Sequence, residues 1–566
     1  MLIIHKASAG SGKTYTLTYT YIKLLLGEKS AKDGLYYIAP STDRNRHRGI
    51  LAVTFTNKAT EEMKQRIVAR LSELADGRIC AFRNDLCHDL HCNESTLQER
   101  SKQALSELLS DFAQFNVSTI DSFFQTILRT FAREVNLMGS YDIELDENNA
   151  TYVGVSQMLA SINRTTANSP DHRRTEMLTA WLETYMNHRI ASGKAFNIFI
   201  RHSNINSDLV KFIKDSLNET YKLNSGLIAD YMADFDRIMR FGKALSETAK
   251  TLARKITESG KAILSIINEN GWQNMLYASI ISDATRWSNK EFSFTATTQQ
   301  AIDNEAKRFK KDFRHNAGSQ CDSHITGLLK ECVDQINRYN FYSYVLEKLF
   351  YLGLIGEAER FAQIYLRENN AILLSSTNTI LRAIINDEET PFIYERMGVR
   401  LRNFLIDEFQ DTSRMQWLNL SPLIHESLAT DSDNLIIGDE KQAIYRFRNS
   451  DPELISTDVP RDFSTQSQIR GNKPSENTNW RSSGTIVRFN NTLFSVLSSV
   501  LGQENIYKNV IQHIHHTDLP GYVKLFPYTS DMEQALQHMV EEIVRQIKSG
   551  YRQRDIAILV NRRSEG

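Results

Sequence analysis

Residues 2–14 read LIIHKASAGSGKT. The apolar run at the start predicts a short buried strand, and the apolar spacing from about Lys13 to Leu26 predicts a helix. Glycines at positions 10 and 12 let backbone N–H groups turn inward, and the amino end of a helix adds a positive partial charge. A strand, a glycine-rich loop and a helix in this order are typical of a phosphate-binding loop.

The loop predicts a nucleotide site in which each residue type has a chemical purpose. Lys13 is the only cation between positions 7 and 14 and is placed to reach the β- and γ-phosphates of ATP. Thr14 offers a hydroxyl that suits Mg²⁺. Ala7 stands where the general pattern has glycine. The residues expected to bind the nucleotide are Ala7, Ser8, Ala9, Gly10, Ser11, Gly12, Lys13 and Thr14.

A second pair of carboxylates belongs to the same kind of site. Residues 405–408 read LIDE, an apolar strand that ends in two acids. Asp407 is expected to bind Mg²⁺ through water, and Glu408 to orient and deprotonate the water that attacks the γ-phosphate. Such a strand end is common by itself, but together with Lys13 it indicates a nucleotide hydrolase.

Strand and helix patterns alternate around these motifs. Residues 50–53 predict a buried strand, Thr60 a helix N-cap, and the spacing of Met63, Ile67, Leu71 and Leu74 one apolar helix face. Strand patterns return at 404–406 and 435–437, while 150–390 are largely helical by pattern. The alternation favours an α/β fold with a parallel sheet.

The composition is that of a globular protein. Hydrophobic residues make up 41% and charged residues 24% of 566, which excludes a mainly disordered chain, a collagen-like fibre and a disulfide-rich mini-protein. No apolar run approaches the roughly 18–20 residues of a membrane span. Five cysteines indicate a reducing compartment, so we expect a cytoplasmic location and no membrane partner. With a net charge of −1, any contact with nucleic acid must come from a local basic groove.

Five blocks resemble those of superfamily 1 DNA helicases of the UvrD/Rep/RecB group and follow that family's order. Residues 407–413, DEFQDTS, match one of its motifs. The other blocks are VTFTNKA at 53–59, STIDSF at 118–123 (TIHSF in the family), GDEKQAIYRFR at 438–448 (GDxxQxIYxFR) and NWRSS at 479–483 (NYRS). Asp121 takes the place of the family's histidine.

The resemblance implies roles for individual residues. Gln442 would sense the γ-phosphate, Arg481 would be one of two arginines on it, and Trp480 would stack on adenine. With Lys13 and Glu408, Gln442 and Arg481 form the expected catalytic set, while Thr14 and Asp407 are the expected Mg²⁺ ligands. Residues expected to contact DNA are Thr54, Phe55, Thr56, Asn57, Thr119, Ser122, Tyr445 and Phe447. For each aromatic the alternative is core packing, and the Asp121 carboxylate would repel a phosphate.

The resemblance also implies a domain organisation. Residues 1–150 and 390–465 would form a first RecA-like, ATP-binding motor domain, and 151–389 a mainly helical inserted domain. Residues 475–566 would begin a second RecA-like motor domain. The polar composition of 464–479, with Gly471 and Pro474, independently predicts an interdomain linker there. The large insertion, and the absence of room before Ala7 for the family's adenine-reading glutamine, are similar to the RecB and AddA subunits of helicase–nuclease complexes.

The tail predicts an amphipathic helix that ends near Gly550, followed by a buried strand at 556–560. The helix's apolar residues are Leu536, Met539, Val540, Ile543, Val544 and Ile547. The family's last two blocks, which hold the second arginine, are not seen, and neither is a nuclease block. We therefore expect the N-terminal fragment of a longer protein, with any exonuclease activity in a part beyond Gly566.

Two clusters have alternative interpretations. Cys80, Cys87, His88, His91 and Cys92 suggest either a zinc site or free thiols, and their spacing favours free thiols. Lys307, Arg308, Lys310, Lys311 and Arg314 suggest either a solvated helix face, which is favoured, or a contact with the DNA backbone.

Together these features predict an ATP- and Mg²⁺-dependent DNA helicase or translocase, 3′-to-5′ by family analogy, that acts on single-stranded or duplex-end DNA without sequence specificity. It would be the motor of a RecB/AddA-like helicase–nuclease in double-strand break repair and recombination, with an AddB/RecC-like partner subunit. The alternatives are a stand-alone UvrD-like repair helicase and a DNA-binding structural subunit with an inactive motor.

Overall fold

The computed structural model describes most of the chain. The described residues are 1–132, 141–144, 146–162, 172–191, 208–217, 219–232, 234–304, 308–310, 319–385, 393, 397–471, 477–527 and 532–560. They form two compact units. Unit 1 comprises Met1–Thr119, Leu401–Thr412 and Ile424–Gly566, and unit 2 comprises Ile120–Arg400 and Ser413–Leu423. The predicted division into two motor domains and an inserted helical domain stays a prediction.

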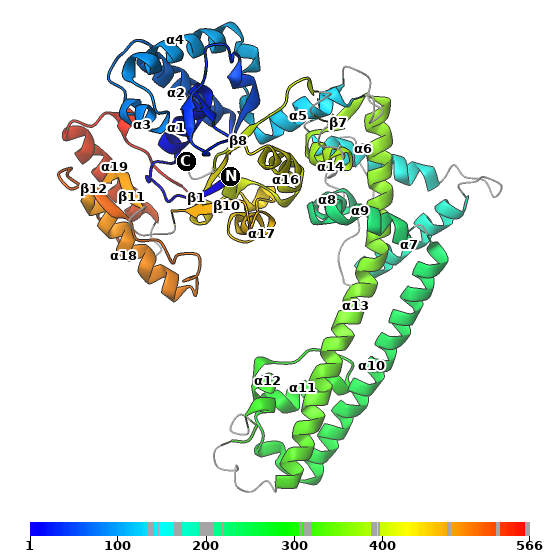
Figure 1. Ribbon diagram of the computed structural model, residues 1–566. Helices are drawn as coiled ribbons and strands as arrows, with labels where there is room; N and C mark the ends of the chain where they lie inside the picture. Colours follow the sequence, from blue (N-terminus) through cyan, green and yellow to red (C-terminus); the bar gives the residue numbers. More distant parts are fainter. Residues whose placement is uncertain are drawn as a thin grey trace. The chain divides into compact units, whose positions relative to one another are not determined.

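A six-stranded sheet organises unit 1, in the order β10-β1-β9-β8-β4-β5. Strands β1, β8 and β10 of this sheet are labelled in Figure 1. Every neighbouring pair is parallel. The predicted α/β fold with a parallel sheet is therefore confirmed. The strands are β1 (Leu2–Lys6), β4 (Ile50–Thr54), β5 (Val117–Thr119), β8 (Asn403–Ile406), β9 (Asn434–Gly438) and β10 (Ser467–Arg470).

Helices and short strands complete unit 1. The helices are α1 (Lys13–Leu26), α2 (Asn57–Ala75), α3 (Arg83–Asp89), α4 (Glu94–Ser110), α17 (Asp458–Asp462), α18 (Gly484–Val500) and α19 (Met532–Lys548), and α16 (Arg414–Ala429) contributes residues to both units. An antiparallel pair joins β2 (Gly27–Lys29) to β3 (Tyr36–Ile38), and a parallel pair joins β11 (Thr478–Ser483) to β12 (His513–His516).

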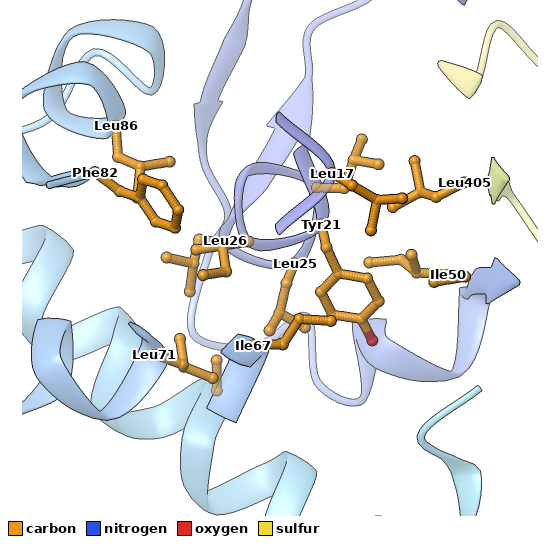
Figure 2. Close-up of a cluster of buried hydrophobic side chains, with 14 of the residues drawn as sticks. Leu17, Tyr21, Leu25, Leu26, Ile50, Ile67, Leu71, Phe82, Leu86 and Leu405 are labelled. Atoms are coloured by element: carbon orange, nitrogen blue, oxygen red, sulfur yellow. The ribbon is translucent and has the colours of Figure 1, made fainter. Parts of the chain in front are cut away.

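The core of unit 1 lies between the sheet and helices α1, α2 and α4. Leu17, Tyr21 and Leu25 of α1 pack with Ile67 of α2 and Ile50 of β4 (Figure 2). The predicted helix at 13–26 coincides with α1. The predicted apolar face of α2 is also confirmed, because its four residues, Met63, Ile67, Leu71 and Leu74, are all buried. Burial of such side chains is worth roughly 1.5–3 kcal/mol each.

The helix start predicted at Thr60 is wrong. Helix α2 begins at Asn57, and its N-cap is Thr56, whose side chain accepts a hydrogen bond from the backbone N–H of Ala59 (3.1 Å). Thr60 lies within the first turn, where its hydroxyl bonds to Thr56 O and Thr54 Oγ1. Threonine occupies both positions, and the sequence pattern alone does not distinguish which one caps the helix.

The predicted linker at 464–479 is wrong over part of its length. Residues 467–470 form β10, which pairs in parallel with β1 at the edge of the sheet. Gly471 then turns the chain with φ +82°, and a Cβ there would lie 1.9 Å from the carbonyl oxygen of Lys6. The glycine that indicated a linker thus allows close approach of two backbones at a strand end. Residues 472–476 lie outside the described residues.

In the tail, the predicted amphipathic helix is confirmed and the predicted strand at 556–560 is not. Helix α19 covers the predicted amphipathic segment, and Gly550 follows it with φ +98°. Residues 556–560 form no strand, and Leu559 is 96% exposed. The prediction of a buried strand there is wrong because an apolar run becomes a strand only where a neighbouring strand completes its hydrogen bonds.

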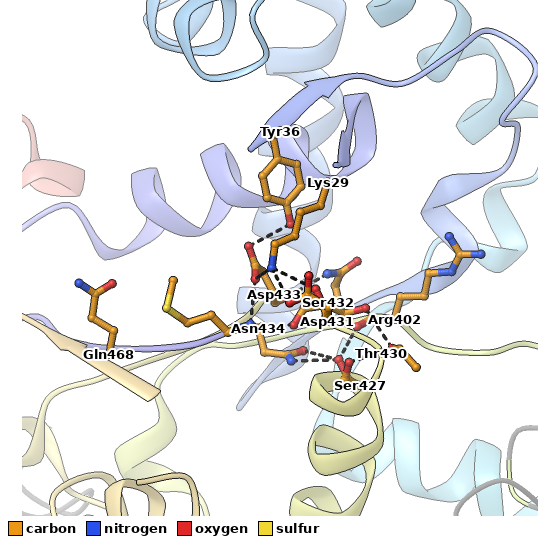
Figure 3. A network of polar contacts seen from close by, with 12 residues as sticks. Lys29, Tyr36, Arg402, Ser427, Thr430, Asp431, Ser432, Asp433, Asn434 and Gln468 are labelled. Atoms are coloured by element: carbon orange, nitrogen blue, oxygen red, sulfur yellow. Dashed lines mark hydrogen bonds and ion pairs between the residues drawn. The ribbon is translucent and has the colours of Figure 1, made fainter. Parts of the chain in front are cut away.

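Polar contacts fix the amino-terminal edge of the sheet (Figure 3). Asn434, at the start of β9, accepts a hydrogen bond from the Phe404 backbone (2.7 Å) and donates one to Ser427 (2.9 Å). Lys29 reaches Asp433 (3.0 Å) and Asp431 (2.9 Å). The Asn434 bond joins the starts of β8 and β9, and the Lys29 pairs attach β2 to the segment before β9.

Unit 2 is mainly helical, as predicted for 150–390. Its longest helices, α10 (Phe235–Glu269) and α13 (Ser319–Glu368), run side by side (Figure 1). The other elements are α5 (Ile120–Thr130), α6 (Glu147–Ile162), α7 (His172–Ala191), α8 (Asp208–Ser216), α9 (Glu219–Met232), α11 (Ala278–Ser288), α12 (Ala296–Asp303), α14 (Thr377–Ile384) and the parallel pair β6 (Asp142–Glu144) and β7 (Ala371–Leu373). Among the described residues, no helix combines the length and apolar character needed to cross a membrane.

The basic cluster around Arg308 is described only in part. Arg308 is buried and donates to the backbone oxygen of Ile302 (3.2 Å), so it fits neither a solvated helix face nor a contact with DNA. Lys310 is exposed. Lys307, Lys311 and Arg314 lie outside the described residues.

Candidate functional site

The candidate site of unit 1 lies at the carboxyl edge of the parallel sheet. The loop between β1 and α1 turns there through two left-handed glycines, Gly10 (φ +75°) and Gly12 (φ +92°). Ser11 bonds back to Ser8 through its backbone N–H (3.2 Å) and its hydroxyl (2.7 Å). Gly12 is the N-cap of α1 and provides no side-chain cap, so the first N–H groups of the helix are available to an anion.

Lys13 and Glu408 meet across the site. The Lys13 ammonium donates to Glu408 Oε2 at 2.8 Å, although the two residues are 395 positions apart. The Lys13 side chain is largely buried, with 11% exposed, while that of Glu408 is 35% exposed. The two residues that the sequence assigned to phosphate binding and proton transfer are therefore brought together.

Asp407 lies beside this pair at the end of β8. Burial, and then the nearby charge of Glu408, raises the pKa of its carboxyl to about 6. A carboxylate that resists ionisation in this way is favourable for a cation, because a divalent ion stabilises its charged form. With the hydroxyl of Thr14 at the start of α1, these oxygen donors fit Mg²⁺, which prefers carboxylates, hydroxyls and water.

Glu408 adopts a backbone conformation that is rare for its residue type. Its φ is +48°, in the left-handed region, and its backbone N–H bonds to the Asp407 side chain (3.0 Å). Such a conformation costs of order 1–2 kcal/mol for a residue with a Cβ. The turn points the Glu408 side chain towards Lys13 instead of letting it continue along the strand direction.

Two residues of the site were not predicted from the sequence. Gln410 is buried and donates to Glu408 Oε2 (2.8 Å). Asp439, also buried, accepts a hydrogen bond from the Gln442 side chain (2.7 Å). Both lie inside motifs recognised in the sequence, at 407–413 and 438–448, so the motif membership of each was a signal, but nothing local indicated their partners.

The segment after β10 reaches the phosphate-binding loop within unit 1. The backbone N–H of Trp480 donates to Gly10 O (2.8 Å), and Gln512 Nε2 donates to Ala9 O (2.9 Å). Asn479 accepts from the backbone N–H of Arg481 (3.0 Å). The structure therefore brings Trp480, the predicted adenine residue, to the loop, and Arg481, the predicted γ-phosphate residue, follows it in the chain.

The environments of Trp480 and Arg481 leave their side chains accessible. Trp480 is 55% exposed, so it is not packed in a core. Its ring lies 3.9 Å from that of His515, and its carbonyl oxygen bonds to His516 (3.0 Å). Arg481 is exposed. The predicted roles of both residues stay predictions.

An aromatic cluster follows β4 and β9. The rings of Phe55 and Tyr445 are 4.6 Å apart, and those of Tyr445 and Phe447 are 5.8 Å apart. The Arg448 guanidinium lies within 6.0 Å of all three rings. Phe447 is 77% exposed, so the core-packing alternative does not apply to it. Accessible rings beside a cation suit a polyanion whose bases stack.

The polar residues predicted to contact DNA lie outside the aromatic cluster, at the ends of strands and the starts of helices. Thr54 is fully buried, and its hydroxyl shares a hydrogen bond with the hydroxyl of Thr60 (2.7 Å), across the turn between β4 and α2. Thr56 caps α2, and Asn57 is exposed at the first position of that helix. Thr119 ends β5, and Ser122 lies in the first turn of α5.

Asp121, where the resembled family has histidine, has a defined partner within unit 2. The Gln416 side chain donates to its carboxylate (2.9 Å), and Gln416 in turn accepts a hydrogen bond from the Ser413 backbone (3.0 Å). The carboxylate therefore joins α5 to α16.

The cysteine cluster has no arrangement suited to a metal. In the part of the chain that the structure describes, no three His, Cys, Asp or Glu side chains are grouped so that they could hold a metal ion. Burial, and then the neighbouring Cys87, raises the pKa of the Cys92 thiol to about 11. A thiol that stays protonated is a poor ligand and a poor nucleophile.

Comparisons with known proteins agree with this geometry. The family model described as the UvrD/REP helicase N-terminal domain matches residues 2–265 and 248–463. A protein of Lactococcus lactis subsp. lactis, named as an ATP-dependent helicase/nuclease subunit, is 24% identical over 99% of this chain and 46% of its own length.

Two RecBCD enzyme subunits named RecB are also similar. The protein of Haemophilus influenzae is 23% identical over 88% of this chain and 40% of its own length. That of Escherichia coli is 24% identical over 87% of this chain and 37% of its own length. The chain thus spans less than half the length of these curated relatives.

Proposed function

Because the chain belongs to the UvrD/REP helicase family, we propose that it is an ATP-dependent DNA helicase or translocase. In this proposal the full protein is the motor subunit of a RecB/AddA-like helicase–nuclease that acts in double-strand break repair and recombination. Movement is 3′ to 5′ along single-stranded DNA, and an AddB/RecC-like subunit is the partner. The names of the relatives, which are helicase/nuclease and RecBCD subunits, support this choice.

The observation that carries the proposal is the Lys13–Glu408 pair. A lysine from a glycine-rich loop and a glutamate from the next-but-one strand of the sheet lie 2.8 Å apart beside the desolvated Asp407. A phosphoryl-transfer site needs a cation for the phosphates and a base for the attacking water, and this pair places one of each in the same site. Both residues lie at the carboxyl edge of the sheet and outside the hydrophobic core cluster of unit 1.

The pair suggests how ATP prepares the site. An entering triphosphate competes for Lys13, which moves from the Glu408 carboxylate to the β- and γ-phosphates. Glu408 is then free to accept a proton from a water molecule. The water oxygen forms a bond to the γ-phosphorus, the bond from that phosphorus to the β–γ bridging oxygen breaks, and ADP and phosphate remain.

Asp407 and Thr14 would hold Mg²⁺ in this site. When bound, Mg²⁺ supplies charge that neutralises the phosphate oxygens. The residues of the chain account for the rest: the N–H groups at the start of α1 bind phosphate, and Arg481 adds positive charge near the γ-phosphate.

The DNA side of the proposal rests on the aromatic cluster of Phe55, Tyr445 and Phe447. Bases of any sequence present a π-face, so stacking on these rings gives binding without sequence preference. Arg448, close to all three rings, adds attraction for the phosphate backbone. The clustering of these rings supports the roles predicted for them.

The test is ATP hydrolysis by the full-length protein with and without single-stranded DNA. We expect DNA to stimulate hydrolysis, and we expect Lys13→Ala to weaken ATP binding at least about 10-fold while the Tm changes little, since loss of a phosphate contact of over about 1.4 kcal/mol gives this factor. Strand displacement from duplexes with a 3′ or a 5′ tail tests the direction.

Lys23→Ala is the matched control. Lys23 lies on the same helix and pairs with Asp89 at 2.6 Å, away from the loop. It should keep wild-type ATP affinity. The proposed function is contradicted if Lys13→Ala binds ATP with unchanged affinity. It is also contradicted if single-stranded DNA does not change the rate of ATP hydrolysis by the wild type.

A further inference from the structure

Gln410 uses both ends of its side chain inside the site. It is buried, with 2% of its surface exposed. Its amide nitrogen donates to Glu408 Oε2 (2.8 Å), and its amide oxygen accepts from the backbone N–H of Asp439 (2.9 Å). A buried amide with both ends bonded is held in one orientation, because each lost bond leaves a polar group unpaired.

The two bonds of Gln410 join different functional parts. Glu408 is the proposed base for hydrolysis. Asp439 begins the segment 439–451, which carries Gln442 and the aromatic rings of Tyr445 and Phe447. Gly438, just before this segment, lies so close that a Cβ there would be 3.0 Å from Gln410 Oε1.

The same segment is also attached at its far end. The backbone N–H of Asp451 donates to Thr412 O (3.0 Å). Segment 439–451 is thus tied to residues 410 and 412 of the short stretch that contains Glu408. Both attachments lie within unit 1. A displacement of the aromatic rings would be passed to this stretch through two hydrogen bonds, of which the Gln410 bond is nearer to Glu408.

We propose that Gln410 is a positioning residue that orients the Glu408 carboxylate according to the state of segment 439–451, so that DNA on the aromatic cluster accelerates ATP hydrolysis. This inference rests on the proposed function. Gln410 touches neither nucleotide nor DNA in this role. It acts through Glu408 on one side and through Asp439 on the other.

The test uses Gln410→Met in the full-length protein, a change that keeps the side-chain length and removes both hydrogen bonds. We expect ATP affinity within about 3-fold of wild type, as the loop at 7–14 is untouched, and at least about a 10-fold loss of DNA-stimulated kcat. The ratio of the rates with and without DNA should fall towards one. A purely structural role would lower stability without changing this ratio.

A second variant separates the two bonds. Gln410→Glu keeps an oxygen for the Asp439 N–H and places a carboxylate oxygen where the amide donated to Glu408. Repulsion there should slow single-turnover hydrolysis at least about 10-fold with ATP affinity retained. If Gln410→Met does not fold, Gln410→Glu serves as the test of the proposal. A wild-type rate of single-turnover hydrolysis in Gln410→Glu overturns the proposal.

Gln416→Met is the matched control. Gln416 is also buried, and its amide bonds to Asp121 and Ser413 instead. It should lose stability but keep the DNA stimulation ratio. An equal loss of the ratio in both variants, or a wild-type ratio in Gln410→Met, overturns the role of Gln410. Absence of DNA-stimulated hydrolysis in the wild type would instead reject the proposed function.

Discussion

Glu408 combines a strained backbone with the central side chain of the site. Its left-handed φ of +48° is unfavourable for any residue with a Cβ, and glycine would relieve it. The strain persists because Asp407 and Gln410 both bond to this residue and hold it in place. At the residue scale, the molecule gives up stability to fix the direction of one carboxylate.

The first prediction at this scale concerns the base. Glu408→Gln keeps the size of the side chain and removes its ability to accept a proton. We expect ATP to bind and single-turnover hydrolysis to slow by about 10²–10⁴-fold, the usual effect of losing a general base. Rapid-quench measurement of the hydrolysis rate checks this. A rate within a few-fold of wild type would mean that another group takes the proton.

Asp411 allows a prediction of pH dependence. Burial, and then the charge of Glu408, raises the pKa of its carboxyl from an ordinary 3.8 to about 6. Between pH 4 and 6 the folded state therefore binds more protons than the unfolded state, so the free energy of unfolding falls as the pH rises. Asp411→Asn removes this loss. Above about pH 7 the variant should be more stable than wild type by roughly 1–3 kcal/mol, and this difference should become smaller towards pH 4.

Chemical denaturation of the nucleotide-free protein between pH 4.5 and 8 checks the sign. Asp111 is the matched control, because its bond with Arg48 lowers its pKa instead. A lowered pKa stabilises the folded state above the ordinary value and loses that effect as the pH falls. Asp111→Asn should thus destabilise the protein at neutral pH. A pH-independent difference for Asp411→Asn would contradict the prediction.

Among the elements of the sheet, the residues that directly follow β4 and β9 contribute more to the candidate site than the residues within these strands. Each strand is followed at once by a residue of the candidate site: Phe55 after β4, and Asp439 after β9. Because the strands are parallel and neighbours of β8, their carboxyl ends share one edge of the sheet. The rings of Phe55 and Tyr445 come together for this reason.

Phe447→Ala tests this cluster. We expect single-stranded DNA to bind more weakly by roughly 1–3 kcal/mol for each lost stacking contact, and by a similar factor for different base compositions. Fluorescence anisotropy with homopolymers and mixed sequences measures it. Ile444→Ala is the control, since Ile444 is also 71% exposed in the same segment but has no aromatic ring. A loss confined to one sequence would indicate base readout.

The tail shows where an element cannot be inferred from its own residues. Helix α19 formed as its spacing predicted, because a helix completes its hydrogen bonds internally. Residues 556–560, equally apolar, did not form a strand. A strand depends on partners supplied by other parts of a sheet, and local pattern does not contain that information.

Over the whole molecule, the residues of the proposed nucleotide site belong to one of the two units. Lys13, Asp407, Glu408, Gln410 and Asp439 all lie in unit 1. Damage to the core of unit 2 should therefore leave nucleotide binding intact, and this expectation can be tested by a substitution far from the site.

Gly353→Ala provides the test. A Cβ at Gly353 would lie 2.5 Å from the ring of Trp181 in the core of unit 2. Overpacking of this kind costs about 1–3 kcal/mol. We expect a lower Tm and an ATP affinity within about 2-fold of wild type at low temperature, measured by calorimetry. Gly327→Ala is the control, because no atom of the described residues lies within 4 Å of its added Cβ. Loss of ATP binding in Gly353→Ala would contradict the independence of the site.

The amino-acid sequence predicted much of unit 1. Local patterns predicted β1, the phosphate-binding loop, α1, the buried face of α2 and the acidic end of β8, since each depends on residues close together in the chain. It also supplied the motifs that mark Lys13, Glu408 and Gln442.

Which of these residues meet depends on the arrangement of the strands in the sheet. The strand order placed β9 between β1 and β8, and so brought Lys13 within 2.8 Å of Glu408, 395 positions away. It also gave Gln410 its two partners and made β10 a strand where a linker was predicted. The physical reason is that hydrogen bonds between strands and contacts between side chains join distant segments, and the spacing of residues along one segment does not specify its partners.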